Sequence, residues 1–373
     1  MEKDFFSVPE GTALEGRIQR LLFHQGYFAV RDIFIPGHSQ APGASTPDVD
    51  VLGCALTEDF YITKTAYDCK SGASQAVNRI LWLQTVAQRI KANRAYIVRN
   101  RTKQGIKFYG LAEGINFIDL QTLTQMEEPY VTGSPQVEAS ASNVFLAATE
   151  ELKSARKEPD VERAMQVIHT EFWFLPSCSA LKRVIAQYER ICPVKSIPGL
   201  SNPSLQWLKG MLVNLFALGV LRICGEVVSL SANERQELLR QRLVSDRMPY
   251  SEFASLVRTT FEYAYSVYGK QAALPLGDYY VVPPPPYTDS LLDLITRALK
   301  RPKEAILIPR FSECILFDYV LLGKTVDQAK VEALFRRPYG DLLAHYRDYL
   351  FFLDAICPST REVLNALFPK AGE

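Results

Sequence analysis

Hydrophobic and polar residues repeat with two different periods along the first 130 residues. Apolar residues recur at helical spacing over 12–24 and again over 73–92, which predicts two amphipathic helices. Apolar residues alternate or cluster in shorter runs elsewhere, and these runs predict strands over 27–35, 49–56, 60–69, 95–98 and 115–118. A helix, three strands, a second helix and further strands predict an α/β fold, with helices flanking a mixed central sheet.

The pattern changes to mostly helical from about residue 144. An amphipathic helix is predicted over 203–218, and the apolar runs 220–224 and 227–230 flank Gly225-Glu226 as a hairpin would. A helix followed by a hairpin favours a winged-helix-like subdomain in this region. The longest apolar stretch, residues 211–221, is too short to span a bilayer, so no membrane segment is expected.

Composition shifts divide the chain into four parts. Residues 1–130 form the predicted α/β domain, and residues 131–143 are rich in Ser, Ala, Gly and Pro, which is typical of a linker. Residues 144–280 form a mainly helical domain. Four consecutive prolines at 283–286 then predict a stiff connector, and residues 287–373 form a helical C-terminal subdomain.

Charge and cysteine content narrow the function classes. The 42 Lys and Arg nearly balance the 41 Asp and Glu, so any surface for nucleic acid must be local. The four histidines are far apart and form no HExxH motif, which argues against a His-based metal site. Seven scattered cysteines without a CxxC pair, and an N-terminus lacking the basic and apolar regions of a signal peptide, predict a cytoplasmic protein with reduced thiols.

Acidic and basic side chains gather around two of the predicted strands. Asp48 and Asp50 stand at the start of one strand, and Asp68 and Lys70 at the end of the next. Residues two apart on a strand point to the same face, so Asp68 and Lys70 are expected side by side. Carboxylate oxygens are the ligands that Mg²⁺ prefers, and a neighbouring Lys can orient water or meet a phosphate.

The segments Pro47-Asp48 and Asp68-Cys69-Lys70 resemble the signature of the PD-(D/E)XK, or restriction-endonuclease-like, nucleases. The likeness covers about residues 8–125, includes the order of elements, and is nearest to the Mrr-type and Holliday-junction-resolvase-like members. Leu14 to Ile18 looks like the first helix of that family, whose Glu maps to Glu15. Leu83 to Val86 looks like its additional Gln motif, which maps to Gln84.

The resemblance implies a catalytic set and a cofactor. Glu15, Asp50, Asp68 and the backbone carbonyl of Cys69 would bind Mg²⁺, with Mn²⁺ as a substitute. Lys70 would position the attacking water, Gln84 would assist, and cleavage would leave a 5′-phosphate.

Three assignments stay open. The strict Pro-Asp match selects Asp48 as the metal ligand, whereas the resolvase-like pattern of an Asp opening an apolar run selects Asp50, which we favour. Glu15 also stands three residues after Thr12, as in a capping box. Asp68 and Lys70 alternatively form a surface ion pair of the weakly stabilising kind.

A basic stretch follows the predicted catalytic strands. No acidic residue occurs between Arg89 and Ala112. The candidate phosphate-binding residues in this stretch are Arg89, Lys91, Arg94, Arg99, Arg101 and Lys103. Such residues would give salt-dependent, sequence-independent affinity for nucleic acid, and the alternative is an ordinary solvated helix end and loop.

The residues and the resemblance together predict a Mg²⁺-dependent endonuclease that acts on DNA. The expected context is bacterial antiviral defence or DNA processing, with the C-terminal half serving specificity, regulation, a partner protein or a homodimer. A nuclease held inactive until a signal releases it is one variant. The alternative class is a non-catalytic nucleic-acid-binding or assembly protein that keeps the fold.

Overall fold

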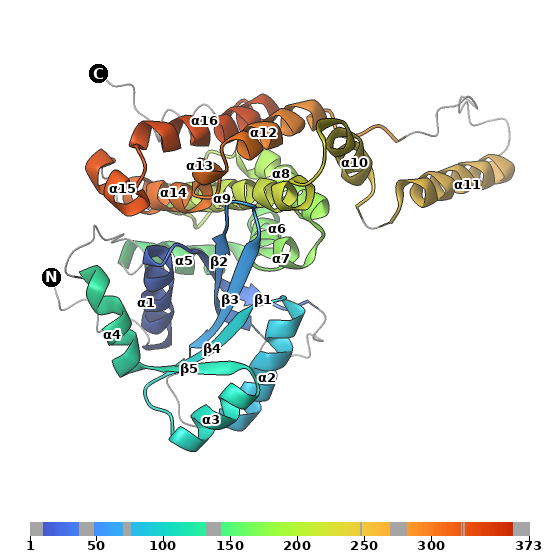
Figure 1. Ribbon diagram of the computed structural model, residues 1–373. Helices are drawn as coiled ribbons and strands as arrows, with labels where there is room; N and C mark the ends of the chain where they lie inside the picture. Colours follow the sequence, from blue (N-terminus) through green and yellow to red (C-terminus); the bar gives the residue numbers. More distant parts are fainter. Residues whose placement is uncertain are drawn as a thin grey trace.

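A computed structural model describes most of the chain: residues 10–36, 48–69, 76–131, 143–246, 248–268, 282–321, 323 and 325–360. The N-terminal part contains a five-stranded sheet with helices on both faces, and the remainder is helical (Figure 1). The coarse α/β-plus-α layout predicted from the sequence is therefore confirmed.

The sheet has the strand order β1-β2-β3-β4-β5. The strands are β1 (Phe28–Phe34), β2 (Asp48–Leu56), β3 (Ile62–Cys69), β4 (Arg94–Arg99) and β5 (Ile115–Asp119). The first three are antiparallel neighbours, whereas β3, β4 and β5 run parallel, so the sheet is mixed. Parallel strands need crossover connections, and helices supply them here.

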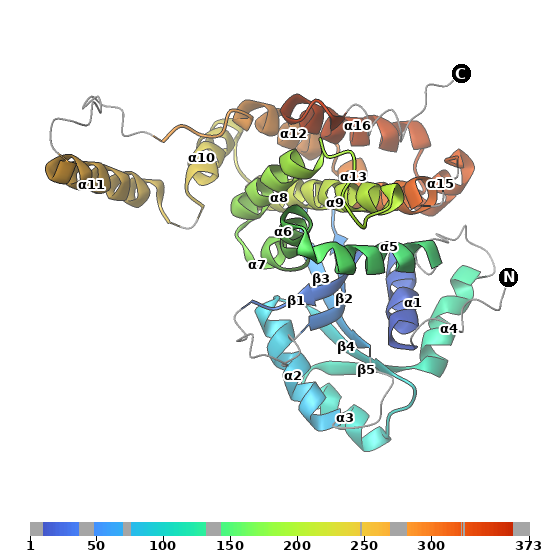
Figure 2. The ribbon, with the colours of Figure 1, turned by 180° about the vertical axis from the view of Figure 1, so that it is seen from behind.

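Four helices flank the sheet: α1 (Glu10–His24), α2 (Ala76–Arg89), α3 (Gln104–Ala112) and α4 (Leu120–Val131). Helices α1 and α4 lie on one face, and α2 and α3 lie on the other (Figures 1 and 2). All five predicted strands and the two predicted helices are confirmed, with ends shifted by up to three residues. Helices α3 and α4 were not predicted, and both are short.

Strand alternation assigns the core residues to the two faces. Val51 and Tyr67 pack with Ile18 and Leu22 of α1, whereas Leu52 and Ala66 belong to the core cluster that includes α2. Because side chains alternate along a strand, Asp50 shares the α2 face with Leu52, and Asp68 shares it with Ala66.

The helical part packs against one end of the sheet, and α11 projects away from the body (Figures 1 and 2). Its longer helices are α5 (Asn143–Ser154), α6 (Pro159–Gln166), α8 (Ser177–Ile191), α9 (Asn202–Val227), α10 (Ala232–Val244), α11 (Tyr250–Tyr268), α12 (Thr288–Lys300), α14 (Ile308–Ile315), α15 (Gln328–Phe335) and α16 (Tyr339–Ile356). Short helical segments join them: η3 (Ala155–Lys157), η4 (Val167–Glu171), α7 (Phe172–Phe174), α13 (Pro302–Ala305) and η6 (Leu316–Leu321). The predicted helical character of residues 144 onward is confirmed across this part.

The predicted hairpin over 220–230, and the winged-helix interpretation built on it, are wrong. Helix α9 runs without interruption from Asn202 to Val227 and is buried along most of its 26 residues. A helix surrounded by other helices is apolar on every side, so its sequence loses the one-sided pattern that distinguishes helix from strand. Tertiary packing also overrides the strand preference of residues such as Val220 and Ile223.

The glycines of α9 mark close contacts rather than ends of elements. A Cβ on Gly219 would lie 2.9 Å from Leu181, and one on Gly225 would lie 2.7 Å from the carbonyl oxygen of Phe60. Gly225 therefore lets the β2–β3 turn rest directly on the helix, which joins the sheet to the helical part. The predicted end of the helix at residue 218 is also wrong, because Gly219 permits a close contact with Leu181 inside a continuous helix.

One helix among the described residues, α9, is long and apolar enough to cross a membrane by length and composition. In this protein 72% of its apolar window is buried inside the chain's own fold, as expected for the core helix of a soluble protein. No disulfide joins any of the seven cysteines, which all lie within the described residues and are all buried.

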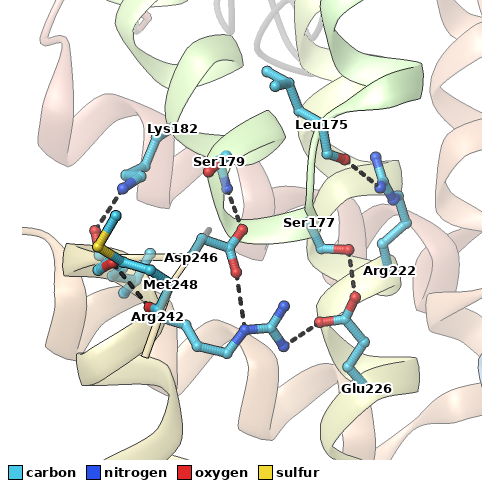
Figure 3. A network of polar contacts seen from close by, with 11 residues as sticks. Leu175, Ser177, Ser179, Lys182, Arg222, Glu226, Arg242, Asp246 and Met248 are labelled. Atoms are coloured by element: carbon cyan, nitrogen blue, oxygen red, sulfur yellow. Dashed lines mark hydrogen bonds and ion pairs between the residues drawn. The ribbon is translucent and has the colours of Figure 1, made fainter. Parts of the chain in front are cut away.

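A network of charged side chains ties α8, α9 and α10 together (Figure 3). The Asp246 carboxylate accepts hydrogen bonds from the backbone N–H of Ser179, at 2.8 Å, and from Nε of Arg242, at 2.9 Å. Arg242 also reaches Glu226, which in turn accepts from the hydroxyl of Ser177. Asp246 thus satisfies a backbone N–H in the first turn of α8, a group that a helix cannot satisfy internally.

Replacing Asp246 by Ala is expected to lower the free energy of unfolding by about 2–3 kcal/mol, because it leaves a partly buried N–H and part of a guanidinium unpaired. Urea unfolding of the full chain measures the change. Asp289→Ala is the matched control, since its pair with Arg240 is exposed and is expected to contribute about 0–1 kcal/mol. Equal effects of the two substitutions would contradict this role for Asp246.

Candidate functional site

The two central acidic residues of the predicted site lie opposite each other on neighbouring strands. Val51 of β2 pairs with Tyr67 of β3 in an antiparallel register, so the next position along places Asp50 opposite Asp68. Both carboxylates are on the α2 face and both are buried, with 2% and 0% of each residue exposed. The structure therefore brings together the two acids that the sequence placed on separate strands.

Asp50 is held by the backbone of the neighbouring strand. Its Oδ2 accepts a hydrogen bond of 2.5 Å from the backbone N–H of Cys69. This hydrogen bond joins the start of β2 to the end of β3. The side chain of Cys69 points to the opposite face and packs with Val51 and Tyr67.

Asp68 is paired with an arginine that the sequence analysis did not identify. Arg79 of α2 donates from Nε to Oδ2 of Asp68 at 2.7 Å, and from Nη2 to Oδ1, so the contact is bidentate. The Arg79 guanidinium also lies over the Trp82 ring, 3.8 Å from its centroid. The only sequence signal was an Arg and an aromatic residue three apart near the start of the helix that follows the motif.

Glu15 does not join the two aspartates. Its Oε2 is 2.8 Å from Nη2 of Arg31, which stands in register with Val51 on β1 and therefore on the α1 face. Among the described residues, no group of three or more His, Cys, Asp or Glu side chains could hold a metal ion. The capping-box alternative for Glu15 is also wrong, because α1 begins at Glu10 and Thr12 lies inside the helix.

Two residues of the predicted site are described only in part or not at all. Asp48 is the first residue of β2 and pairs with Phe34, but its side chain lies outside the described residues. Lys70 immediately follows β3 and also lies outside them. The choice between Asp48 and Asp50 therefore stays a prediction, as does the position of Lys70.

Gln84 contacts a loop rather than the aspartates. Its Nε2 donates to Oε2 of Glu113 at 3.1 Å, so it links α2 to the segment between α3 and β5. Arg79 and Gln84 are five residues apart, which places them about 140° apart around the helix. In this arrangement the α2 residue beside Asp68 is Arg79.

The basic stretch is divided between two ends of the sheet. Arg89, Lys91 and Arg94 lie at or before the start of β4, and their side chains are exposed. Arg99, Arg101 and Lys103 lie at its other end, which is the end shared with Asp68 because β3 and β4 are parallel. A strand of this length separates the two groups by roughly 17–20 Å, so they do not form one compact patch.

Of these two basic groups, only the one at the far end of β4 lies at the end of the sheet that carries Asp68. Arg101 and Lys103 are exposed there, whereas Arg99 is buried at the end of β4. Lys107, further along, bonds Asp119 at 2.7 Å and lowers the pKa of that carboxyl to about 2. Of the six basic residues of this stretch, Arg101 and Lys103 are thus the exposed ones at the end of the sheet that carries Asp68.

A separate cavity of about 60 Å³ lies between β1 and the helical part. Apolar side chains from α5, η4 and α9 make most of its wall, and Gln19, Arg31, His169 and Glu313 add polar groups. Neither Asp50 nor Asp68 lines it, so the cavity and the aspartate pair are different places in the fold.

Comparisons of the chain with protein-family models, with curated proteins and with solved structures found no match.

Proposed function

We propose that this chain is a divalent-metal-dependent nuclease of the PD-(D/E)XK type that hydrolyses phosphodiester bonds of DNA. The observation that carries the proposal is the pair Asp50 and Asp68, two buried carboxylates at opposed positions on the same face of β2 and β3. Like charges directly opposite each other destabilise a sheet. Their presence is more readily explained by a cation that binds both than by folding stability.

The arrangement of the elements also supports the proposal. A helix, an antiparallel three-stranded meander, a second helix and a parallel fourth strand follow one another. In this order β3 ends directly before Lys70, at the edge where β2 begins. A Lys at this point would stand beside both carboxylates, as the PD-(D/E)XK resemblance implies.

Each residue would have a distinct role. Asp50, Asp68 and the carbonyl of Cys69 would hold Mg²⁺ or Mn²⁺, and water would complete the coordination. The bound ion would supply charge stabilisation on the phosphate and lower the pKa of a water molecule. Lys70 would orient the attacking water. Glu15, which is bonded to Arg31 in this structure, is not needed for this two-carboxylate site.

The rest of the chain would serve recognition and control. Arg101 and Lys103 would bind DNA phosphates beside the site, giving salt-dependent affinity. The helical part, packed against the sheet, would provide specificity, a partner surface or regulation. We propose a cytoplasmic protein of bacterial defence or DNA processing, by analogy with nucleases that carry such an additional region.

One observation favours a second candidate, a non-catalytic nucleic-acid-binding protein. Asp68 already has a full bidentate partner in Arg79, so its charge is compensated without a metal. A binding protein would keep this ion pair permanently and would show no Mn²⁺ affinity that depends on Asp50 and Asp68.

A cleavage assay tests the proposal. The full chain and its Asp68→Ala/Lys70→Ala variant are incubated with supercoiled plasmid or single-stranded DNA in Mg²⁺, Mn²⁺ or EDTA. We expect metal-dependent nicking by the wild type, which identifies an endonuclease because a closed circle has no ends, and no cutting by the variant. Asp119→Asn/Lys107→Ala is the control, because it removes another helix-to-strand ion pair at the same sheet edge.

The outcomes separate the candidates. Cutting that survives in the Asp68/Lys70 variant, or that persists in EDTA, would overturn the proposed mechanism. No cutting by any form, together with calorimetry showing no Asp68-dependent Mn²⁺ binding, would favour the binding protein.

A further inference from the structure

Arg79 occupies both oxygens of the acid that the proposed metal would need. The guanidinium binds Asp68 through two parallel N–H···O contacts, one of 2.7 Å, and Asp68 itself is fully buried. A bidentate arginine pair is the strongest and most directional contact a carboxylate makes with a side chain. A divalent ion and Arg79 would therefore compete for the same two oxygens.

The electrostatics of the aspartate pair explain why such a counter-ion is present. Two carboxylates at opposed positions on neighbouring strands repel each other, and burial removes the water that would screen them. Asp50 is compensated by the backbone N–H of Cys69, a neutral donor. Arg79 places a full positive charge against the Asp68 carboxylate.

The surroundings of Arg79 suit movement more than permanent burial. Its side chain is 29% exposed, although its partner Asp68 is not exposed at all. Trp82, one turn later on α2, lies beneath the guanidinium and provides a flat surface on which it can shift while staying stacked. Arg79 is also the fourth residue of α2, close to the end of the helix nearest Lys70 in the sequence.

We propose that Arg79 is an exchangeable counter-ion of the metal site: it neutralises Asp68 in the metal-free chain, and on metal binding it transfers to a phosphate of the nucleic-acid substrate. The transfer needs no net loss of ion pairs, because the guanidinium fork matches phosphate oxygens as well as carboxylate oxygens. Arg79 then couples metal binding to DNA binding. This inference rests on the proposed nuclease function.

Calorimetric titration of the full chain with Mn²⁺ tests the competition. Removing Arg79 removes the competitor, so Arg79→Ala is expected to bind Mn²⁺ about tenfold more tightly or better. Arg79→Lys keeps the positive charge but lacks the bidentate guanidinium. Its Mn²⁺ affinity is therefore expected to lie between those of the wild type and Arg79→Ala. Lys107→Ala is the matched control, because Lys107 also joins a helix to an aspartate at a strand end, and its Mn²⁺ affinity should equal that of the wild type.

Binding of a fluorescent duplex oligonucleotide supplies the second readout. In the presence of Mn²⁺, Arg79→Ala should bind the duplex about tenfold more weakly, whereas in EDTA, where Arg79 is occupied by Asp68, the loss should be small. A merely structural ion pair predicts no gain in Mn²⁺ affinity and no difference between Mn²⁺ and EDTA. Circular dichroism establishes that each variant is folded, and Arg79→Gln, which is shorter and uncharged but keeps an amide donor, replaces Arg79→Ala if the latter unfolds.

The results distinguish this inference from the proposed function. Wild-type Mn²⁺ binding that is lost in Asp68→Asn but not strengthened in Arg79→Ala or Arg79→Gln would overturn the counter-ion role and leave the nuclease proposal intact. Absence of any Asp68-dependent Mn²⁺ binding, in the wild type and in the Arg79 variants alike, would overturn both.

Discussion

Replacing Asp50 by Asn is expected to lower the metal-dependent cleavage rate by about a thousandfold or more, equivalent to roughly 4 kcal/mol of transition-state stabilisation. The amide oxygen of Asn can still accept the hydrogen bond from the backbone N–H of Cys69, so the strands stay joined. What is lost is the negative charge opposite Asp68. Single-turnover cleavage of plasmid DNA in Mg²⁺ measures the change.

Asp48→Asn is the natural comparison, because Asp48 is two residues away on the same strand. If Asp50 is the metal ligand, Asp48→Asn should stay within about tenfold of the wild type, since a residue at the rim contributes at most long-range charge. The reverse result, an active Asp50→Asn and an inactive Asp48→Asn, would assign the ligand to Asp48. Wild-type activity in both variants would contradict the proposed site.

The sheet could be predicted from the sequence because its strands carry regular signals. β1 alternates between buried and half-buried positions, β3 ends in a continuous buried run, and a short turn joins β2 to β3. The opposed positions of Asp50 and Asp68 then follow from register, which a short turn largely determines. The proximity of residues on neighbouring strands, such as Asp50 and Asp68, could therefore be predicted from the sequence.

Contacts made by long side chains across the fold were not predictable. Arg79 reaches Asp68 only because α2 packs across the face that carries the aspartates, and no local pattern indicates that partner. Glu15 lies on the expected helix, but Arg31 on the neighbouring strand binds it. The basic run appeared continuous in sequence, yet β4 passes through it and separates its two halves.

Helix α9 illustrates a different failure. Its apolar residues surround the helix because other helices pack on several sides, and periodicity carries no information in that case. The glycines at 219 and 225 then looked like ends of elements, although they permit close packing against Leu181 and Phe60. Such positions can be interpreted only once the neighbouring elements are known.

The stability of the full chain is expected to fall as the pH rises from about 6.5 to 8.5, and Glu313→Gln is expected to remove most of that fall. Glu313 lies on α14 and faces Gln19 of α1, and burial raises the pKa of its carboxyl from 4.5 to about 8. The folded protein therefore retains a proton that the unfolded chain releases. This contribution to stability is complete below about pH 4.5 and is lost as the pH rises through about 8.

The size of the effect follows from proton linkage. Between the two pKa values the free energy of unfolding decreases by about 1.4 kcal/mol per pH unit, so a loss of roughly 3–5 kcal/mol is the upper range for this group. Gln has nearly the same shape and stays neutral, so the variant should match the wild type near pH 5 and exceed it at pH 8.5. Urea unfolding at several pH values measures the difference.

His24 provides a control, because its effect on the pH dependence of stability has the opposite sign. Burial lowers the pKa of His24 from 6.5 to about 4, so its contribution to stability is lost as the pH falls from 6.5 toward 4. His24→Gln should therefore change the acid limb of the stability profile and leave the alkaline limb unaltered. If the fall in stability at alkaline pH persists in Glu313→Gln, another group must cause it.

The position of Glu313 makes this effect informative about how the two parts of the chain are joined. On the same helix, Arg310 donates to the carbonyl oxygen of Phe23 at 2.6 Å, near the end of α1. Arg310 and Glu313 thus connect the helical part to the helix that covers one face of the sheet. If ionising Glu313 weakens this contact, the helical part should loosen from the sheet above about pH 8 before either part unfolds. Hydrogen exchange in α1 and α14 that accelerates together over that range, in the wild type but not in Glu313→Gln, is the expected result.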